Sequence, residues 1–421
     1  MNEKSAPKVL IITRFFVPYF PSLGGVIRIL TLANYLSSKD INVNILSGDG
    51  EFHGYFGFDI NKLNIQFLHT QQKKLGGLLK KNASFLSKLL KTGIRLIRAC
   101  LLELKIADEH ERYFSLFFEA ATKIIDEQQI ANVILSTPPH SMQKIGYKIK
   151  RKYKGRINLI VDYRDSWNNS KIFRKRTIIG RIISTMLERR VLKSCDYFTY
   201  VSTPIIDKII NNYKIDITHK SKLIMNGFTD NIISNSTLTA KASTDKKIVG
   251  YFGHISDNSK SYRSVKKLLE ILEEDKYLDE HFEFHFYGSV IFNSPLIKGL
   301  KSIYIHDKLE HSDVSNKMKE MDYLLIVHSD SGSSDEVITG KIFEYISVKK
   351  PILCLAPKNM EGGKLVEKYR MGLHVDINRH DEMVKGLYSV LSMNTERFYS
   401  NVDIKQFSRE IQYTGFLELL K

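Results

Sequence analysis

Short apolar runs that alternate with segments of helical periodicity constrain the fold of this chain most. Each run has the length and composition of a buried parallel strand, and most are followed by a loop and then by apolar residues at helical spacing. The runs lie at 8–13, 42–46, 132–136, 158–161 and 197–201, and again at 247–252, 283–287, 303–305, 323–327, 351–355 and 372–375. Strands that alternate with helices in this way predict an α/β fold with parallel sheets covered by helices.

The same pattern starts twice, which predicts two domains. At 421 residues the chain is too long for a single hydrophobic core. The segment 231–246 is rich in Ser, Thr and Asn with little apolar periodicity, which is typical of a linker. We therefore expect one domain at 1–230, a second at 247–402 and a C-terminal helix at 403–421. A return of this helix to the first domain is one arrangement that we consider.

Charge and cysteine content narrow the compartment and the partners. Cys100, Cys195 and Cys354 are far apart in the sequence and lack the spacing of metal ligands, which favours a reducing compartment and argues against disulfides or zinc. No stretch approaches the roughly 18 apolar residues of a membrane span, and the apolar run at 9–12 is too short for a signal peptide. We therefore expect a cytoplasmic protein. The net charge of +17 indicates an anionic partner, and nucleic acid, an anionic membrane surface and a phosphorylated substrate are the alternatives.

The segment 331–351, SGSSDEVITGKIFEYISVKKP, carries the strongest signal for a binding site. It follows an apolar strand, and its Thr-Gly-Lys at 339–341 predicts the start of a helix. The junction between a strand and a helix N-terminus binds phosphate in α/β folds, because free N–H groups and the positive end of the helix dipole converge there. Glu344, one turn inside that helix, would accept hydrogen bonds from a vicinal diol such as a ribose, and Glu336 would lie beside the group that the phosphate carries. Both glutamates are also consistent with solvated surface carboxylates.

A Gly-Gly pair follows the first strand. Gly24 and Gly25 stand at the start of an expected helix, where the lack of a side chain lets a ligand approach the backbone. The pattern is not the dinucleotide fingerprint GxGxxG, and no acidic residue ends the second strand to hold an adenosine ribose. A phosphate or sugar site is therefore favoured over an NAD site, and a plain tight turn is the structural alternative.

A histidine follows the strand at 132–136. The run Thr-Pro-Pro-His-Ser at 137–141 places His140 at a helix start, and open parallel sheets bind ligands at the carboxyl ends of their strands. There His140 would donate to, or orient, a sugar hydroxyl or a leaving phosphate. The alternative is a structural histidine.

The run DYRDSW follows the next strand. It brings Asp162, Arg164 and Asp165 together as a charge cluster that would shape an acceptor pocket. An internal salt bridge that fixes the loop is equally consistent with this pattern. Trp167, at the end of the run, would be either a stacking platform or part of the core.

Cations follow the first strand of the second half. That strand ends in Gly253-His254, and Lys260 and Arg263 lie on the polar loop before the next helix. Positive side chains at this place suit a diphosphate, whose charge builds up as it leaves. A solvated loop is the alternative.

The segment 71–105 predicts a basic amphipathic helix. Its apolar residues recur at Leu79, Leu86, Leu90, Ile94, Ile97 and Leu101. Its other side carries Lys81, Lys88, Arg95 and Arg98, and Glu103 is its only acid. An anionic bilayer surface is a natural partner for such a helix, and packing on the domain with a solvated basic face is the alternative. A second basic helix is expected at 174–193.

The chain resembles the GT-B glycosyltransferases of family 4, a retaining family, along nearly its whole length. The resemblance rests on Gly24-Gly25 with Arg28, on the runs at His140, Asp162–Trp167, Met225–Phe228 and Gly253–Arg263, and above all on the two glutamates of E-x7-E at Glu336 and Glu344. It implies two Rossmann-like domains that face a central cleft, with a nucleotide diphosphate sugar held mainly by the second domain.

The resemblance also implies roles for single residues. It assigns the ribose hydroxyls to Glu344, the donor sugar to Glu336, the diphosphate to Lys260, the phosphate or sugar from the first domain to the Gly25 backbone, and the role of the active-site histidine to His140. The family often has Arg where His254 stands, which puts its usual phosphate clamp in doubt. We add Arg263 and Lys341 as phosphate contacts on their positions in this sequence.

The function implied is the transfer of a sugar, with UDP-sugars favoured as donors, to a saccharide or polyprenyl-linked acceptor. The Thr-Gly-Lys form of the motif resembles relatives that build bacterial surface polysaccharides. The chain has no Asp-x-Asp pair, so we expect a metal-independent, retaining reaction without a cofactor. We expect the protein at the inner face of the cell membrane, held there by 71–105. A nucleotide-sugar epimerase of the same fold and a basic nucleic-acid-binding protein are the alternatives, and no recognisable module supports nucleic acid as a partner.

Overall fold

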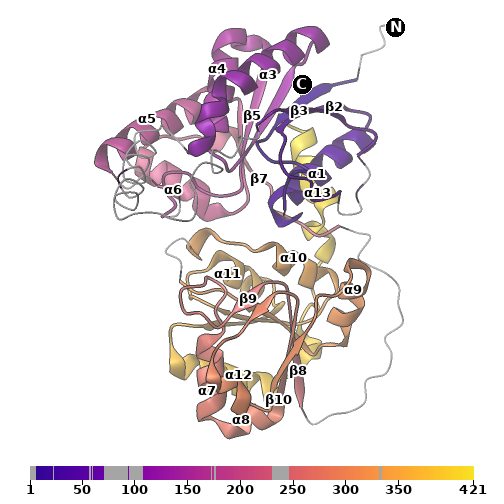
Figure 1. Ribbon diagram of the computed structural model, residues 1–421, viewed down its shortest axis with the longest axis vertical. Helices are drawn as coiled ribbons and strands as arrows, with labels where there is room; N and C mark the ends of the chain where they lie inside the picture. The colour runs from indigo at the N-terminus through magenta and orange to yellow at the C-terminus, as the bar shows by residue number, and fades with distance from the viewer. Residues whose placement is uncertain are drawn as a thin grey trace, which may run out of the picture. The chain divides into compact units, whose positions relative to one another are not determined.

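The protein consists of two compact α/β units, each with its own sheet and core (Figure 1). Unit 1 comprises residues 1–225 and 413–421, and unit 2 comprises residues 226–412. The computed structural model describes residues 6–21, 23–55, 58, 60–70, 93, 108–171, 173–174, 177–229, 246–330 and 334–421.

Unit 1 is built on a seven-stranded sheet in the order β3-β2-β1-β4-β5-β6-β7, and all its neighbouring strands run parallel. The strands are β1 (Lys8–Ile12), β2 (Asn42–Gly48), β3 (Asn64–Leu68), β4 (Asn132–Thr137), β5 (Asn158–Tyr163), β6 (Tyr197–Tyr200) and β7 (Ser221–Leu223). The strand order reverses between β1 and β4, as in Rossmann-type folds, and the carboxyl ends of these central strands border the position where such folds bind ligands.

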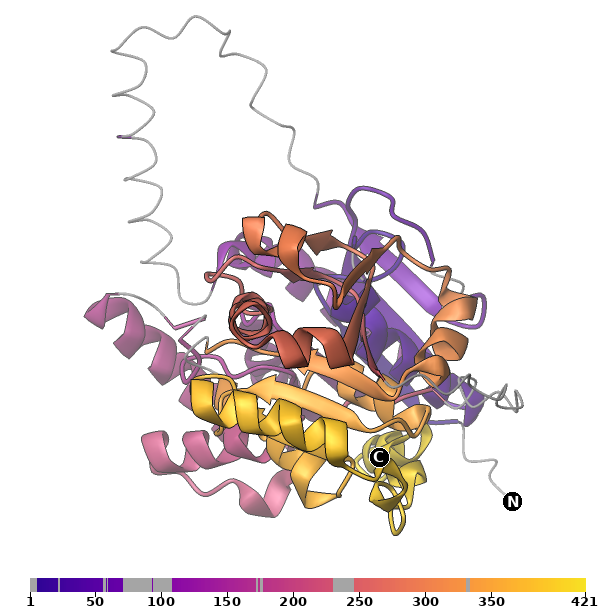
Figure 2. The same cartoon turned by 90° about the horizontal axis from the view of Figure 1, so that it is seen from below.

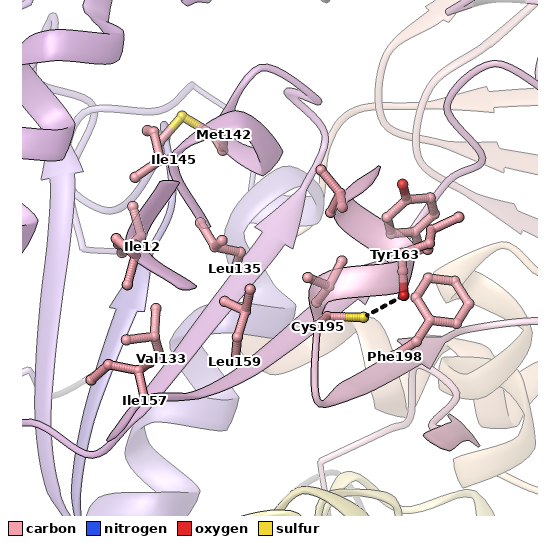
Figure 3. Close-up of a cluster of buried hydrophobic side chains, with 14 of the residues drawn as sticks. Ile12, Val133, Leu135, Met142, Ile145, Ile157, Leu159, Tyr163, Cys195 and Phe198 are labelled. Atoms are coloured by element: carbon pink, nitrogen blue, oxygen red, sulfur yellow. Dashed lines mark hydrogen bonds between the residues drawn. The ribbon is translucent and has the colours of Figure 1, made fainter. Parts of the chain in front are cut away.

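Helices cover both faces of this sheet because successive strand residues point to opposite sides. The helices are α1 (Leu23–Ser38), α3 (Phe114–Gln128), α4 (Met142–Tyr153), α5 (Ile178–Ser194), α6 (Thr203–Tyr213) and the end of α13 (Arg409–Leu417). Leu10 and Ile12 of β1 belong to a core with α3 to α6, and Figure 3 shows Ile12 of this core with residues of β4, β5 and α4. Val9 and Ile11 belong to the opposite core, with α1.

The C-terminal residues return to unit 1. Tyr413 and Phe416 are buried in the same core as α1, beside which α13 lies in Figure 1. The Tyr413 hydroxyl forms a hydrogen bond with the Thr31 hydroxyl at 2.8 Å. The return considered from the sequence is therefore found, but the helix starts at Arg409 and not at 403, after a 3-10 turn at Ile404–Phe407.

Unit 2 is built on a six-stranded parallel sheet in the order β12-β10-β8-β13-β14-β15. The strands are β8 (Lys247–Phe252), β10 (Phe282–Tyr287), β12 (Ile303–His306), β13 (Tyr323–Val327), β14 (Ile352–Ala356) and β15 (Gly372–Asp376). A separate pair joins β9 (Ile255–Ser256) and β11 (Val290–Ile291) beyond the ends of β8 and β10.

Two groups of helices cover the sheet of unit 2. They are α7 (Lys266–Glu274), α8 (Lys276–His281), α9 (His311–Glu320), α10 (Gly340–Ser347), α11 (Glu361–Lys368) and α12 (His380–Ser392). Residues of α7, α8 and α12 share one core, and Figure 2, which views the chain from below, shows these three helices on the near side. Helices α10 and α11 contact β13 and β14.

The boundary between the units falls after Met225, not after residue 230. The reason is local packing, because Phe228 forms a bridge with Ser408, and a Cβ at Gly227 would lie 2.7 Å from the amide nitrogen of Arg409. The linker predicted at 231–246 lies outside the described residues except for Lys246, and the basic helix predicted at 71–105 lies outside them except for Gly93. Within the described ranges, no helix has the length and apolar character that a bilayer span requires.

Candidate functional site

A small cavity opens at the carboxyl ends of β8 and β13 in unit 2. Its volume is about 60 Å³, enough for a phosphate-sized group or a few water molecules. It is lined by Tyr251, Tyr262, Arg263, Ile326, Val327, His328, Val337, Thr339 and Lys341. The cavity therefore collects residues from two strand ends, from the loop before α7 and from the start of α10. This is the region where the sequence predicted phosphate binding.

A wider depression of about 530 Å³ lies elsewhere on unit 2. It is lined by Tyr277, Tyr388, Leu391 and Ser392. None of these four side chains is charged at neutral pH, so this surface offers no counter-charge to a phosphate. The smaller cavity is the better candidate because its lining includes two cations.

Lys341 is the cation at the start of α10. The side chain of Thr339 caps this helix and accepts a hydrogen bond from the Lys341 amide at 3.2 Å, which confirms the predicted helix start. The Lys341 Nζ donates to the Tyr251 hydroxyl at 2.6 Å and lies 4.1 Å from the centre of the Tyr251 ring. Burial and, to a smaller extent, Arg263 lower the pKa of Lys341, and Glu344 opposes them, so that the pKa is about 7. A bound anion would restore the charge of this amine.

Glycines bring Lys341 close to the end of β8. Gly253 has φ +126°, and a Cβ at this position would lie 2.8 Å from the Lys341 Nζ. Gly288, with φ +116°, approaches Gly253 so closely that a Cβ there would lie 2.9 Å from the Gly253 oxygen. A side chain at either position would have to displace the neighbouring atom. In addition, both residues have a positive φ, which glycine adopts more readily than any other residue. These close approaches keep the backbone bare beside the cation.

Arg263 is the second cation of the cavity. Its guanidinium carbon lies 5.0 Å from the centre of the Tyr262 ring. Lys260, expected on the same loop as the diphosphate contact, is exposed and does not line the cavity. The loop path explains the difference, because the Arg263 carbonyl accepts from the Ser256 amide while the Lys260 amide donates to the Asn258 side chain at the outer turn.

His328 lines the cavity directly after β13. It is buried, and its Nε2 has no hydrogen-bond partner among the described residues. Burial lowers the pKa of His328 to about 4, and Arg263 adds to the shift, so the ring is neutral. The sequence analysis missed this residue, although its position at the end of a buried strand is a signal that could have found it. His254, where the resembling family often has Arg, is exposed at the end of β8, and its Nδ1 lies 3.2 Å from the Ser289 hydroxyl.

In the chain, the paired glutamates flank three of the cavity residues, Val337, Thr339 and Lys341. Glu336 belongs to a short 3-10 turn, Ser334–Glu336, and is 6% exposed, so it is not a solvated surface carboxylate. Glu344 lies on α10 three residues after Lys341 and is exposed. For Glu344 both interpretations from the sequence therefore stay open.

In unit 1, His140 lies between β4 and α4 in an aromatic environment. It is buried, with its ring stacked on Trp167 at 5.5 Å and in edge contact with Phe173 at 5.0 Å. Neither ring nitrogen has a partner within hydrogen-bond geometry in the described chain. Burial lowers the pKa of His140 to about 3, Arg164 adds to the shift, and the main chain of Ser166 opposes it. His140 is therefore neutral, and Trp167 is a core residue that orients its ring.

The expected charge cluster in DYRDSW is arranged differently from the prediction. The Asp162 carboxylate accepts hydrogen bonds from Arg28 Nη2 at 2.8 Å and Nε at 3.0 Å, and both side chains are buried. It also accepts from the hydroxyls of Ser136 and Thr199, each at 2.8 Å. Burial raises the pKa of Asp162, but Arg28 and the hydroxyls outweigh this effect and lower it. The ion pair joins Asp162 to α1 and not to Arg164, which favours a structural role for this carboxylate.

Arg164 contacts main-chain carbonyls. Its guanidinium donates to the carbonyl oxygens of Gly25 at 2.5 Å, Pro138 at 2.6 Å and Thr137 at 3.2 Å. It thereby connects the start of α1 to the loop that carries His140. Asp165, next in the chain, is exposed, which leaves it as the one carboxylate of the three-residue cluster at the surface.

Gly25 lies in the first turn of α1, as predicted. A Cβ at this position would lie 2.3 Å from the Phe20 ring, so the packing of Phe20 requires the glycine. The amides of a first helical turn have no partner within their helix. Among the described residues no group of three or more His, Cys, Asp or Glu side chains could hold a metal ion.

Solved structures with a similar fold cover nearly the whole chain. Sucrose-phosphate synthase from Thermosynechococcus elongatus matches with a TM-score of 0.63 and 11% identity, covering 98% of both chains. The lipopolysaccharide outer core galactosyltransferase WaaB matches with a TM-score of 0.61 and 14% identity, covering 98% of both chains. A trehalose-phosphate synthase from Burkholderia xenovorans in complex with glucose-6-phosphate matches with a TM-score of 0.61 and 10% identity, covering 99% of this chain and 100% of that chain.

The comparisons of sequence found no match. No family model and no curated protein matches the chain. The structural likeness extends over both units at low identity, and it therefore shows the fold alone: two Rossmann-like units in the GT-B arrangement of strands and helices.

Proposed function

We propose that the protein is a glycosyltransferase that moves a sugar from a nucleotide diphosphate sugar to a saccharide or lipid-linked acceptor. The observation that carries this proposal is the cavity of unit 2, where Arg263 and Lys341 converge beside the bare backbone of Gly253. Two cations at the carboxyl ends of parallel strands suit a diphosphate. The similar solved structures, which include a galactosyltransferase and two sugar-phosphate synthases, support this reading.

Within this proposal unit 2 binds the donor. Arg263 and Lys341 contact the diphosphate, Lys260 adds a weaker charge from the outer part of its loop, and the helix start at Thr339 adds amides. Glu344, one turn further along α10, accepts from the ribose hydroxyls. Glu336 contacts the donor sugar, and a mostly buried carboxylate is suited to a fixed hydrogen bond with a hydroxyl.

Unit 1 contributes the acceptor side and His140. A neutral imidazole such as that of His140 can exchange a hydrogen bond with a sugar hydroxyl. Arg164 positions both the His140 loop and the Gly25 backbone, whose amide would approach the phosphate or the sugar. Asp165 is the surface carboxylate available to an acceptor. Asp162 has a structural role, because its salt bridge with Arg28 fixes the end of β5.

The chemistry follows from charge. The diphosphate gains negative charge as its bond to the sugar breaks, and Arg263 and Lys341 would neutralise that charge without a metal ion. We propose retention at the anomeric carbon, with the leaving phosphate assisting deprotonation of the acceptor hydroxyl. UDP-sugars are the favoured donors, and the expected setting is bacterial surface polysaccharide synthesis at the inner face of the cell membrane.

The test is UDP release from UDP-sugars, with and without an acceptor extract. A transferase releases UDP in step with acceptor addition, and His140→Leu should lower kcat by roughly 100-fold or more while UDP still binds to unit 2. Acceptor-independent isomerisation of the donor sugar without UDP release would instead identify an epimerase. Failure of UDP to bind would refute the donor assignment.

A further inference from the structure

Helix α5 presents an apolar face to solvent. The exposed side chains are Ile178, Ile179, Ile182, Ile183 and Met186, with exposed fractions from 39% to 69%. At 100° per residue these five positions fall within a sector of about 140°. Exposed apolar residues that gather on one helical face indicate a contact surface, whereas single ones are ordinary.

Cations continue the same face toward the C-terminal end of α5. Arg189, Arg190 and Lys193 are exposed and fall within the same sector. The one acid of the helix, Glu188, points the other way and is fully buried. Its carboxylate accepts hydrogen bonds from Asn168 Nδ2 at 2.7 Å and from the hydroxyls of Tyr163 and Tyr213. The solvent face of α5 therefore carries apolar and positive side chains and no negative one.

The buried face of α5 fixes this orientation. Leu187, Val191 and Leu192 belong to the core of unit 1, and α5 packs along α4 (Figure 1). The Thr177 side chain caps the helix by accepting from the Gly180 amide at 3.1 Å. The helix cannot turn its isoleucines inward without exposing Glu188 and breaking its hydrogen bonds. The apolar face is therefore held outward by the fold.

We propose that the solvent face of α5 docks on an anionic phospholipid surface. A rigid helix with apolar residues and cations on one face inserts its apolar side chains at the headgroup boundary while its cations contact lipid phosphates. Charge excludes the other occupants. A second copy of α5 would oppose cations with cations, and the segment 71–105, itself basic with Glu103 as its only acid, would do the same.

This inference deepens the proposed function, which expects a lipid-linked acceptor at a membrane. It assigns the lipid contact to α5, which the sequence analysis expected only as a second basic helix at 174–193. The two are tested by different measurements. Co-sedimentation with vesicles measures lipid binding, and the affinity for UDP measures donor binding to unit 2.

The experiment measures co-sedimentation of the full chain with phosphatidylcholine vesicles, with and without phosphatidylglycerol. We expect binding to be stronger with phosphatidylglycerol. Arg189→Gln/Arg190→Gln should weaken binding to the anionic vesicles by about 25-fold, at about fivefold per cation, and leave binding to neutral vesicles unchanged. Ile182→Gln/Ile183→Gln should weaken binding to both kinds of vesicle by roughly tenfold or more.

Matched controls change exposed residues outside α5. Ile411→Gln removes an equally exposed isoleucine of α13, and Lys385→Gln/Lys405→Gln removes two exposed cations of unit 2. These variants should bind vesicles as the unchanged protein does. All variants should keep the UDP affinity and the thermal unfolding temperature, because the changed side chains are exposed.

Three results would overturn the proposal. In the first, both α5 variants sediment with anionic vesicles as the unchanged protein does. In the second, sedimentation velocity shows a dimer that Ile182→Gln/Ile183→Gln dissociates while lipid binding is unaffected. In the third, that variant loses thermal stability without losing lipid binding, which would mean that the chain itself covers this face. If the unchanged protein did not bind UDP, that result would count against the proposed function and not against the lipid contact.

Discussion

Units 1 and 2 both place cations near the carboxyl ends of their central strands, but they neutralise them differently. In unit 1, Arg28 is paired with Asp162, and two hydroxyls complete the shell of the carboxylate. In unit 2, Arg263 and Lys341 line one cavity, and neither forms a salt bridge within the described part of the chain. In unit 1 the two charges of Arg28 and Asp162 neutralise each other, and the pair stabilises the fold. In unit 2, burial and the neighbouring Arg263 lower the pKa of Lys341, and an anionic ligand would oppose that shift.

The largest expected effect tests the pair in unit 1. Asp162→Ala should lower the free energy of unfolding by about 3–5 kcal/mol, because it leaves the Arg28 guanidinium buried without its counter-ion. Urea denaturation measures the change. Asp165→Ala, in the same loop but exposed, is the matched control and should change stability by less than about 0.5 kcal/mol. Equal effects of the two substitutions would contradict the structural role of Asp162.

The next effect tests the cations of unit 2. Lys341→Met should weaken UDP binding by about 100-fold, which corresponds to about 2.7 kcal/mol, because it removes a charge-assisted contact to the diphosphate. It should not lower the free energy of unfolding, since the removed amine is partly desolvated and forms no salt bridge with a carboxylate of the described residues. Calorimetric titration with UDP and urea denaturation give the two readouts. Lys260→Met is the control. If Lys260→Met weakened UDP binding more than Lys341→Met, the main diphosphate contact would be Lys260 on the outer loop and not Lys341.

The pH dependence of binding sharpens the same contrast. The pKa of Lys341 is about 7 without ligand, and a bound diphosphate would raise it. UDP affinity should therefore be fully present below pH 7 and fall as the pH rises above 7, by at most about tenfold per pH unit. The measurement is the UDP dissociation constant between about pH 7.5 and 9, where the nucleotide is already ionised. Lys341→Met should abolish the slope, and a slope that persists in this variant would assign the proton to another group.

The smallest expected effect concerns the exposed glutamate of α10. Glu344→Gln should weaken UDP binding by roughly five- to tenfold, as for one charge-assisted hydrogen bond to a ribose hydroxyl. The unchanged protein should lose a similar factor with a deoxyribose analogue of UDP, and the variant should lose nothing further with that analogue. Glu273→Gln, an exposed glutamate of α7, is the control. Independent losses from the substitution and the analogue would show that Glu344 is a solvated carboxylate.

The sequence by itself determined the α/β class and most of the strands. It did not reveal β3, β7, β9 and β11, and it placed the start of the last helix at 403 instead of Arg409. The runs 247–252 and 323–327 coincide with β8 and β13, and Thr339 caps α10 as its position predicted. These features were predictable because hydrophobic periodicity and capping act between residues a few positions apart.

Only the tertiary structure decided which charged residues meet. Asp162 and Arg164 are neighbours in the chain, yet the partner of Asp162 is Arg28, 134 positions away, and Arg164 binds main-chain carbonyls instead. Lys260 and Arg263 share a loop, and only Arg263 reaches the cavity that holds Lys341. Local sequence cannot predict such choices, because they depend on how strand ends from distant parts of the chain are placed side by side and on which polar groups burial then forces into contact.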